Sequence, residues 1–190
     1  MVLTNDVELA DKMALLRSHG ITRDPAQMTH EADGPWYYQQ IDLGFNYRMT
    51  ELQAALGVTQ MERLDQYVAR RHQLARRYDD LLTDLPVTTP WQHADSYSGL
   101  HLYVIRLKLD QIQKTHRQVF ESLREQGIGV NLHYIPVHMQ PHYERMGFAP
   151  ADFPQAQVYY QEAISIPMFQ TMTDEQQDEV LKALKNALEE

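Results

Sequence analysis

The sequence predicts an α/β protein in which helices cover a small, mostly antiparallel sheet and one long helix precedes this α+β domain. Three short stretches alternate between apolar and polar residues, which is the period of strands. Three capping boxes each precede a stretch with helical apolar spacing. The 190 residues are 43% hydrophobic and 23% charged, which is ordinary for a folded domain.

The first four residues, Met1 to Thr4, predict a short strand. Because a strand needs a paired neighbour, we expect this chain to begin inside a domain. Asp6 can cap a helix that Gly20 would end in the left-handed conformation. We expect the helix to bury the face formed by Leu9, Met13 and Leu16. Residues 1–50 would then be a remnant of a larger domain.

Residues 21–45 show no period and contain two prolines, two glycines and the aromatic run Trp36-Tyr37-Tyr38. A connection of this length without regular structure is unusual in a compact domain, so it is either functional or ordered by a partner. We favour a partner.

A capping box at Thr50 and Gln53 predicts the longest helix, which we expect to run without interruption to about Leu82 within a linking segment of residues 51–85. Arg70 and Arg71 interrupt the register of its apolar face. That face comprises Leu52, Leu56, Met61, Leu64, Val68, Leu74, Tyr78 and Leu81.

Residues 86–190 predict the small α/β domain. Strands are expected at residues 103–109, 128–134 and 164–168, where apolar residues recur at every second position. Capping boxes at Thr115 and Thr173 predict two helices, the first closed by Gly127. The second helix would turn Val180, Leu181, Leu184 and Leu188 inward.

Composition excludes several classes of function. The net charge of -9 argues against binding to nucleic acid. The chain has no cysteine, no apolar run that would span a membrane and no signal peptide, so we expect a cytoplasmic protein. It has no glycine-rich phosphate loop. Its five lysines all lie where a solvated ammonium is expected, so we assign no catalytic residue.

The densest polar cluster spans residues 131–142 and includes His133, Tyr134 and His138. A metal site is one interpretation, because imidazoles at such separations can share an ion. However, Pro136 and Pro141 break the helical spacing, and no carboxylate lies among these histidines until Glu144. We therefore predict a polar substrate pocket and no metal.

Asn46 and Arg48 lie just before the capped helix that begins near Glu51. Free backbone N–H groups at such an end favour an anion such as phosphate. The alternative is that Asn46 forms an ordinary turn and Arg48 a surface ion pair.

These segments together resemble the DegT/DnrJ/EryC1/StrS aminotransferases, in order and over essentially the whole chain. Within that family the similarity is greatest to enzymes that aminate the 4-keto group of UDP-linked 4-keto-6-deoxy-N-acetyl sugars on the pseudaminic acid pathway. The segments that carry the resemblance are residues 15–21, 44–50, 53–57, 133–138, 153–156 and 164–168.

The resemblance implies the C-terminal portion of a fold-type-I transferase that uses pyridoxal 5'-phosphate. It implies that Asn46 reaches into a neighbouring subunit and binds the cofactor phosphate, so that a homodimer completes each site. Arg48 would lie near the substrate diphosphate. His133, Tyr134 and His138 would line the pocket for the sugar nucleotide, and glutamate is an example of the amino donor.

The family's cofactor-binding lysine belongs to a segment that would precede Met1. We therefore expect these 190 residues alone to be inactive and to hold no cofactor. Three hypotheses remain open: part of an aminotransferase, a dimerisation or binding module without catalysis, or an unrelated helical scaffold. The scaffold leaves the segments around Asn46 and His133 without an explanation.

Overall fold

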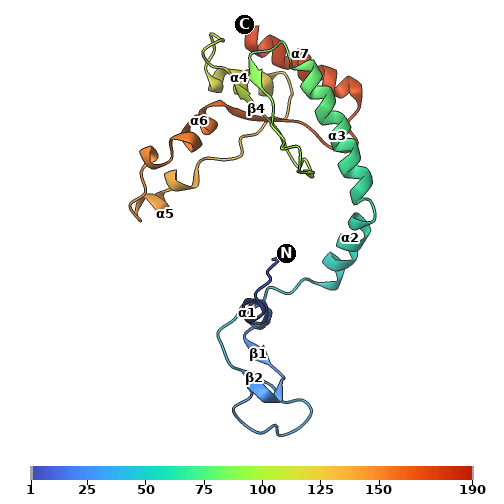
Figure 1. The fold of residues 1–190 in the computed structure, drawn as a ribbon, viewed down its shortest axis with the longest axis vertical. Coiled ribbons are helices and arrows are strands. Elements are labelled where there is room, and N and C mark those ends of the chain that lie inside the picture. The colour runs from blue at the N-terminus through green and yellow to red at the C-terminus, as the bar shows by residue number, and fades with distance from the viewer. Residues whose placement is uncertain (1, 190) are drawn as a thin grey trace. The chain divides into compact units, whose positions relative to one another are not determined.

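The computed structural model describes residues 2–189 and divides the chain into two compact units, Met1–Glu62 and Arg63–Glu190. Figure 1 labels their helices and strands. Each unit has its own secondary structure. No helix among residues 2–189 is both long and apolar enough to cross a bilayer.

The first unit contains helix α1 (Val7–Arg17), the two-residue strands β1 (Ile21–Thr22) and β2 (Gln39–Gln40), the 3-10 helix η1 (Pro25–Gln27) and helix α2 (Glu51–Met61). β1 and β2 pair antiparallel within the segment expected to be aperiodic. In residues 21–45, all of which are described, this two-residue ribbon is the only strand pairing. The Asp6 carboxylate caps α1 by accepting from the Leu9 backbone N–H at 3.1 Å, as predicted.

Two predictions for the first unit were wrong. Residues 2–4 form no strand, and Met1 lies outside the described residues. Val2 and Leu3 are exposed, because no described segment pairs with them. Helix α1 begins after its predicted cap Asp6 and ends at Arg17, three residues before Gly20, but it buries none of its residues.

The predicted long helix is also divided. Helix α2 ends at Met61 and helix α3 (Leu64–Leu81) begins after Arg63, whose φ of -105° and ψ of 1° are not helical. The apolar face changes character at this break. Leu52 and Leu56 are 84% and 64% exposed, whereas Leu74 and Tyr78 are completely buried. One sequence period therefore covers two helices with different surroundings.

The second unit is built on an antiparallel sheet in the order β3-β4-β5, with β3 at Val87–Thr88, β4 at Tyr103–Leu107 and β5 at Ala163–Ile166. β4 lies in the middle, with Val87 opposite Leu107 and Ile105 opposite Ile164. The predicted alternation in β4 is confirmed, because Tyr103, Ile105 and Leu107 are buried.

The strand predicted at residues 128–134 does not form. Only Asn131 pairs with the sheet, through an isolated bridge to Ser165. Of the four alternating apolar residues, only Val130 is buried and Tyr134 is 71% exposed, so the alternation predicted neither a ladder nor a continuous buried face. Glycine at position 129 and proline at position 136 flank the bridge, and both residues disfavour an extended ladder.

Helices complete this unit: α4 (His116–Glu125), η2 (Val137–Met139), α5 (Pro141–Glu144), η3 (Pro150–Asp152), α6 (Pro154–Glu162) and α7 (Asp174–Glu189). The boxes at Thr50 and Thr115 form as predicted, since each threonine hydroxyl and the glutamine three residues later cap each other's backbone. Thr173 and Gln176 make the same reciprocal bonds at the start of α7, at 3.0 and 3.2 Å.

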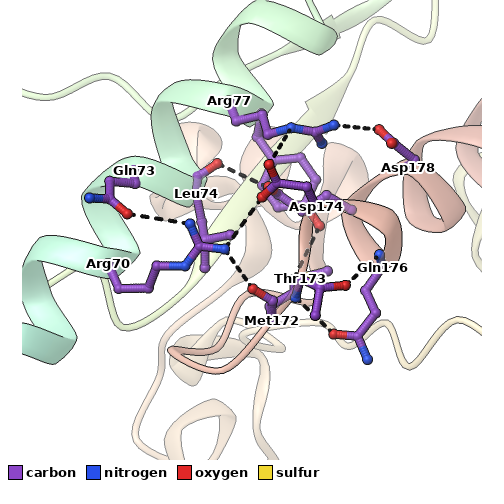
Figure 2. A network of polar contacts seen from close by, with 11 residues as sticks. Arg70, Gln73, Leu74, Arg77, Met172, Thr173, Asp174, Gln176 and Asp178 are labelled. Atoms are coloured by element: carbon purple, nitrogen blue, oxygen red, sulfur yellow. Dashed lines mark hydrogen bonds and ion pairs between the residues drawn. The ribbon is translucent and has the colours of Figure 1, made fainter.

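Helix α3 contacts helix α7 near the N-terminal end of α7 (Figure 2). Gln177, which is completely buried, donates from its amide to the Leu74 carbonyl at 3.0 Å. Figure 2 shows the polar contacts at the margin of this interface. Arg70 donates to the Met172 carbonyl at 2.7 Å, and Arg77 pairs with Asp178 at 2.7 Å.

The two arginines that interrupt the apolar register both bind loop carbonyls. Arg70 does so at Met172, and Arg71 donates from Nη1 to the carbonyls of Leu100 and His101, at 2.9 Å each. Leu100 has a φ of +43°, a conformation that side chains other than glycine adopt at some cost. Arg71 therefore stabilises a loop that the local sequence alone does not favour.

We predict that Arg71→Ala lowers the free energy of unfolding by about 1.5–3 kcal/mol, because two carbonyls lose a charged donor. Arg76, on the same helix, is exposed and makes no polar contact within residues 2–189, so Arg76→Ala should change it by less than about 0.5 kcal/mol. Urea unfolding of both variants measures the difference. Equal losses would contradict the role given to Arg71.

A second prediction concerns alkaline pH. Burial raises the pKa of Tyr103 above its ordinary value of 10.0, and hydrogen bonding to Asp79 raises it further. Burial likewise raises the pKa of Tyr78. Both tyrosines stay neutral in the folded protein after they ionise in the unfolded chain, so their stabilisation is complete below pH 10 and is lost as pH rises above it.

We therefore expect the free energy of unfolding to fall above about pH 10 by about 1.4 kcal/mol per pH unit for each tyrosine. Urea titrations near pH 8 and pH 11 measure this slope. Tyr103→Phe should reduce the slope. Tyr97→Phe, at an exposed tyrosine, should leave it unchanged. A wild-type slope in Tyr103→Phe would disprove the assignment.

Candidate functional site

Two glycines place the segment that contains Asn46 and Arg48. Gly20 has a φ of +69°, and a Cβ there would lie 1.9 Å from the Asp42 carbonyl oxygen. A Cβ on Gly44 would lie 2.2 Å from the Gly20 nitrogen. The chain after Gly44 therefore crosses the end of α1 with the two backbones in direct contact, at a separation that admits no side chain.

Backbone hydrogen bonds continue this crossing. The Phe45 N–H donates to Leu16 at 2.7 Å, and the Tyr47 N–H donates to Arg17 at 3.0 Å. An isolated antiparallel bridge joins Ser18 to Asn46. The backbone of the Asn46 segment is thus held by the C-terminal end of α1, not by the capped N-terminus of α2.

The side chains of Asn46 and Arg48 are exposed and have no hydrogen-bond partner within residues 2–189. The predicted alternative, an ion pair of Arg48, is absent from these residues. Thr50 and Gln53 already bond each other's backbone at the start of α2, and Glu51 adds an acidic group to its first turn. An anion would therefore meet Arg48 more readily than the end of this helix.

Arg48 lies on a shallow depression in the first unit, lined by Ser18, His19, Ile21, Arg23, Tyr38 and Arg48. Two guanidinium groups and an imidazole gather there, and the Arg23 guanidinium lies 6.0 Å from the centre of the Tyr38 ring. Sequence reasoning missed His19, Arg23 and Tyr38, because only the fold brings them to Arg48. Such a lining suits an anionic group.

In the second unit, His133 and Tyr134 lie next to the sheet. The Nδ1 of His133 is 2.8 Å from the Ser165 hydroxyl, and the two aromatic rings meet edge to face at 4.7 Å. Tyr134 is 71% exposed. These neighbouring side chains can therefore contact a ligand, with His133 held on its Nδ1 side.

His138 is placed differently. It lies in η2 and is only 8% exposed. Its Nε2 accepts from the Gln157 amide at 2.9 Å, and its ring packs on Phe153 at 4.7 Å. The structure thus uses His138 to join η2 to α6, and a ligand would reach only a small part of it. Ser165 and Gln157, which hold the two histidines, carried no signal in the local sequence pattern.

Among residues 2–189, no three His, Asp or Glu side chains are arranged to hold a metal ion. The metal interpretation of the histidine segment therefore gains no support from these residues. What the described residues offer is two sets of polar side chains, one on each unit.

Solved sugar aminotransferases share this fold. PseC of Helicobacter pylori, described as an aminotransferase involved in the biosynthesis of pseudoaminic acid, matches 98% of this chain and 47% of its own, with a TM-score of 0.84 and 27% identity. The putative sugar aminotransferase Spr1654 of Streptococcus pneumoniae, solved in its PLP-form, shares the fold at 23% identity, with a TM-score of 0.81 over 98% of this chain and 45% of that one.

Sequence comparison identifies the family of aminotransferases to which the chain belongs. The model of the DegT/DnrJ/EryC1/StrS aminotransferase family matches residues 1–185, and the chain belongs to this family. The spore coat polysaccharide biosynthesis protein SpsC of Bacillus subtilis (strain 168) is 36% identical over 189 residues, which are 98% of this chain and 48% of SpsC. The chain spans about half the length of the curated relatives it matches.

The glycine crossing generates a prediction. Gly44→Ala should destabilise the first unit by more than about 2 kcal/mol, because its Cβ meets backbone that cannot rotate away. Gly57 is a matched control in α2, where a Cβ meets nothing within 4 Å, so Gly57→Ala should be neutral or stabilise by up to about 1 kcal/mol. Amide hydrogen exchange of residues 15–48 measures the effect. Unchanged protection in Gly44→Ala would show that the two backbones can separate without cost.

Proposed function

We propose that this chain is the C-terminal part of a cytoplasmic, pyridoxal-phosphate-dependent aminotransferase that aminates the 4-keto group of a UDP-linked 4-keto-6-deoxy sugar for surface polysaccharide or glycan synthesis. The observation that carries the proposal is the family match over residues 1–185. PseC and SpsC, whose descriptions name pseudoaminic acid and spore coat polysaccharide, support the choice of sugar chemistry.

The residues of the first unit fit the phosphate groups that this function requires. Asn46 offers an unpaired amide, and Arg48 lines the cationic depression with His19 and Arg23. We assign Asn46 to the phosphate of pyridoxal 5'-phosphate and Arg48 to the diphosphate of the nucleotide sugar. The cofactor, when bound, supplies the electron sink for transfer of the amino group.

The residues of the second unit are assigned to the sugar nucleotide. His133 and Tyr134 present polar groups, and the ring of Tyr134 is itself exposed. This combination suits a sugar with both polar and apolar faces. His138 enters this proposal as a residue that supports the pocket wall, because Gln157 occupies its Nε2.

Homodimerisation belongs to the same proposal. Residues 36–47, which include Asn46, expose large apolar side chains that a monomer would leave in water, namely Trp36, Tyr38, Leu43, Phe45 and Tyr47. An exposed apolar surface of this kind favours association. In the proposed dimer, Asn46 serves the site of the neighbouring subunit.

Transamination by these 190 residues alone is not part of the proposal. Lys12 is paired with Asp42, and the remaining lysines lie outside both the depression and the histidine segment. A base that moves the proton during amino transfer would therefore come from another part of the complete protein.

The test uses the complete polypeptide that contains this chain, with a UDP-linked 4-keto sugar and glutamate as amino donor. Asn46→Ala should weaken retention of pyridoxal phosphate about tenfold or more, because a phosphate loses a hydrogen-bond donor. Asn5→Ala, at another exposed asparagine of the first unit, should leave retention unchanged. Absorbance of the bound cofactor after gel filtration measures both variants.

Two results would overturn the proposal. If the complete polypeptide aminates no nucleotide sugar, the enzyme assignment fails. If it does so while Asn46→Ala retains the cofactor like wild type, the assignment of Asn46 fails. The alternative of a non-catalytic dimerisation module predicts self-association of the 190-residue chain with no amination by any longer form.

A further inference from the structure

Ser165 is a buried polar residue that the proposed function does not use. It lies on β5, is 5% exposed and stands opposite Val104 on the neighbouring strand. On its other side it pairs with Asn131: the Asn131 N–H donates to the Ser165 carbonyl at 3.1 Å, and the Ser165 N–H donates to the Asn131 carbonyl at 2.8 Å. Ser165 therefore lies between β4 and the Asn131 segment, and both of its backbone hydrogen-bonding groups bond to Asn131.

The bridge to Asn131 also places His133. Residues two apart on an extended segment share a face, so His133 lies on the same side as Asn131 and diagonal to Ser165. The distance from its Nδ1 to the Ser165 hydroxyl is 2.8 Å. The other ring nitrogen, Nε2, has no hydrogen-bond partner within residues 2–189. One side of the imidazole is thus engaged and the other is available.

The direction of this hydrogen bond follows from the surroundings of the hydroxyl. Within residues 2–189, the Ser165 hydroxyl contacts no acceptor other than His133 Nδ1. If Nδ1 carried the proton and donated it, the buried O–H would have no acceptor, which costs about 1–3 kcal/mol. The favoured arrangement has the hydroxyl donating to Nδ1, so the neutral imidazole carries its proton on Nε2.

We propose that Ser165 is a positioning residue for His133: its hydroxyl fixes the ring and the tautomer, so that Nε2–H is presented as a hydrogen-bond donor to the ligand. The ligand would be an acceptor-rich group such as a sugar hydroxyl, a keto oxygen or a phosphate oxygen. That last step rests on the proposed function, whereas the tautomer does not.

The tautomer can be tested in the 190-residue chain by long-range 1H–15N correlation spectra, recorded where the histidines are neutral. Wild type should show His133 as one tautomer, protonated at Nε2. Ser165→Ala should shift both nitrogens toward the averaged values of a free imidazole, and Ser165→Thr, which keeps the hydroxyl, should restore the wild-type signals.

His116 is the internal control. Its Nε2 lies 2.9 Å from the carbonyl oxygen of Ala163 on the same strand, and a carbonyl can only accept. Its signals should stay those of the Nε2–H tautomer in all three proteins. If His116 changes in Ser165→Ala, the strand is disturbed, and Ser165→Cys, whose thiol is of similar size and a weak donor, replaces that variant and should give partial averaging.

Three results would overturn the proposal: averaged His133 signals in wild type, a proton on Nδ1, or wild-type His133 signals in Ser165→Ala. In the complete enzyme, Ser165→Ala should raise KM for the nucleotide sugar about fivefold, with kcat within about twofold of wild type. If the wild-type complete enzyme shows no amination, only the proposed function is refuted. The spectra of the 190-residue chain still decide the role of Ser165.

Discussion

The packing of Tyr78 against Tyr103 is the interaction on which the second unit depends. Their ring centres are 5.0 Å apart, and both rings are fully or almost fully buried. Each phenol still finds an acceptor: Tyr78 donates to the Pro167 carbonyl at 2.8 Å and Tyr103 to Asp79 at 2.5 Å. Two side chains thus join α3 to the middle strand and to the loop that follows β5. Leu74 and Leu82 add to this packing from the same segment, since both are buried in the core.

Strand β5 connects the core to the polar side chains of the second unit. Its four residues are buried, and Ile164 belongs to the core. At the same time its polar groups reach outward: the Ala163 carbonyl contacts His116, and Ser165 contacts His133. Both histidines therefore contact a fully buried strand, which gives a site on an irregular segment a defined geometry.

Sequence reasoning succeeded where a local interaction decides the structure. Capping boxes at Thr50, Thr115 and Thr173 need only residues within one turn, and all three form. It failed where distant residues decide. The break before α3 and the single bridge at Asn131 depend on what each segment packs against, and an apolar period does not reveal that.

The same distinction applies to the candidate site. Asn46, Arg48, His133 and Tyr134 were recognisable from their segments, and their side chains are at least partly accessible. His138 had the same polar character in the sequence, but Gln157 and Phe153 take up its ring within the protein. Arg23 and Tyr38 lie near Arg48 only because β1 and β2 pair. Strands of two residues are too short to be recognised in the sequence.

Because Gly20 and Gly44 are in contact, the residue type at one position constrains the residue type at the other. A side chain at either position alone would clash with backbone, so a second substitution cannot compensate for the first. A relative that keeps this crossing must therefore keep both glycines, whereas a relative that has lost one is free to lose the second. In comparisons of such chains, the pair is a better marker of a correctly placed Asn46 than the asparagine itself, which many loops could carry by chance.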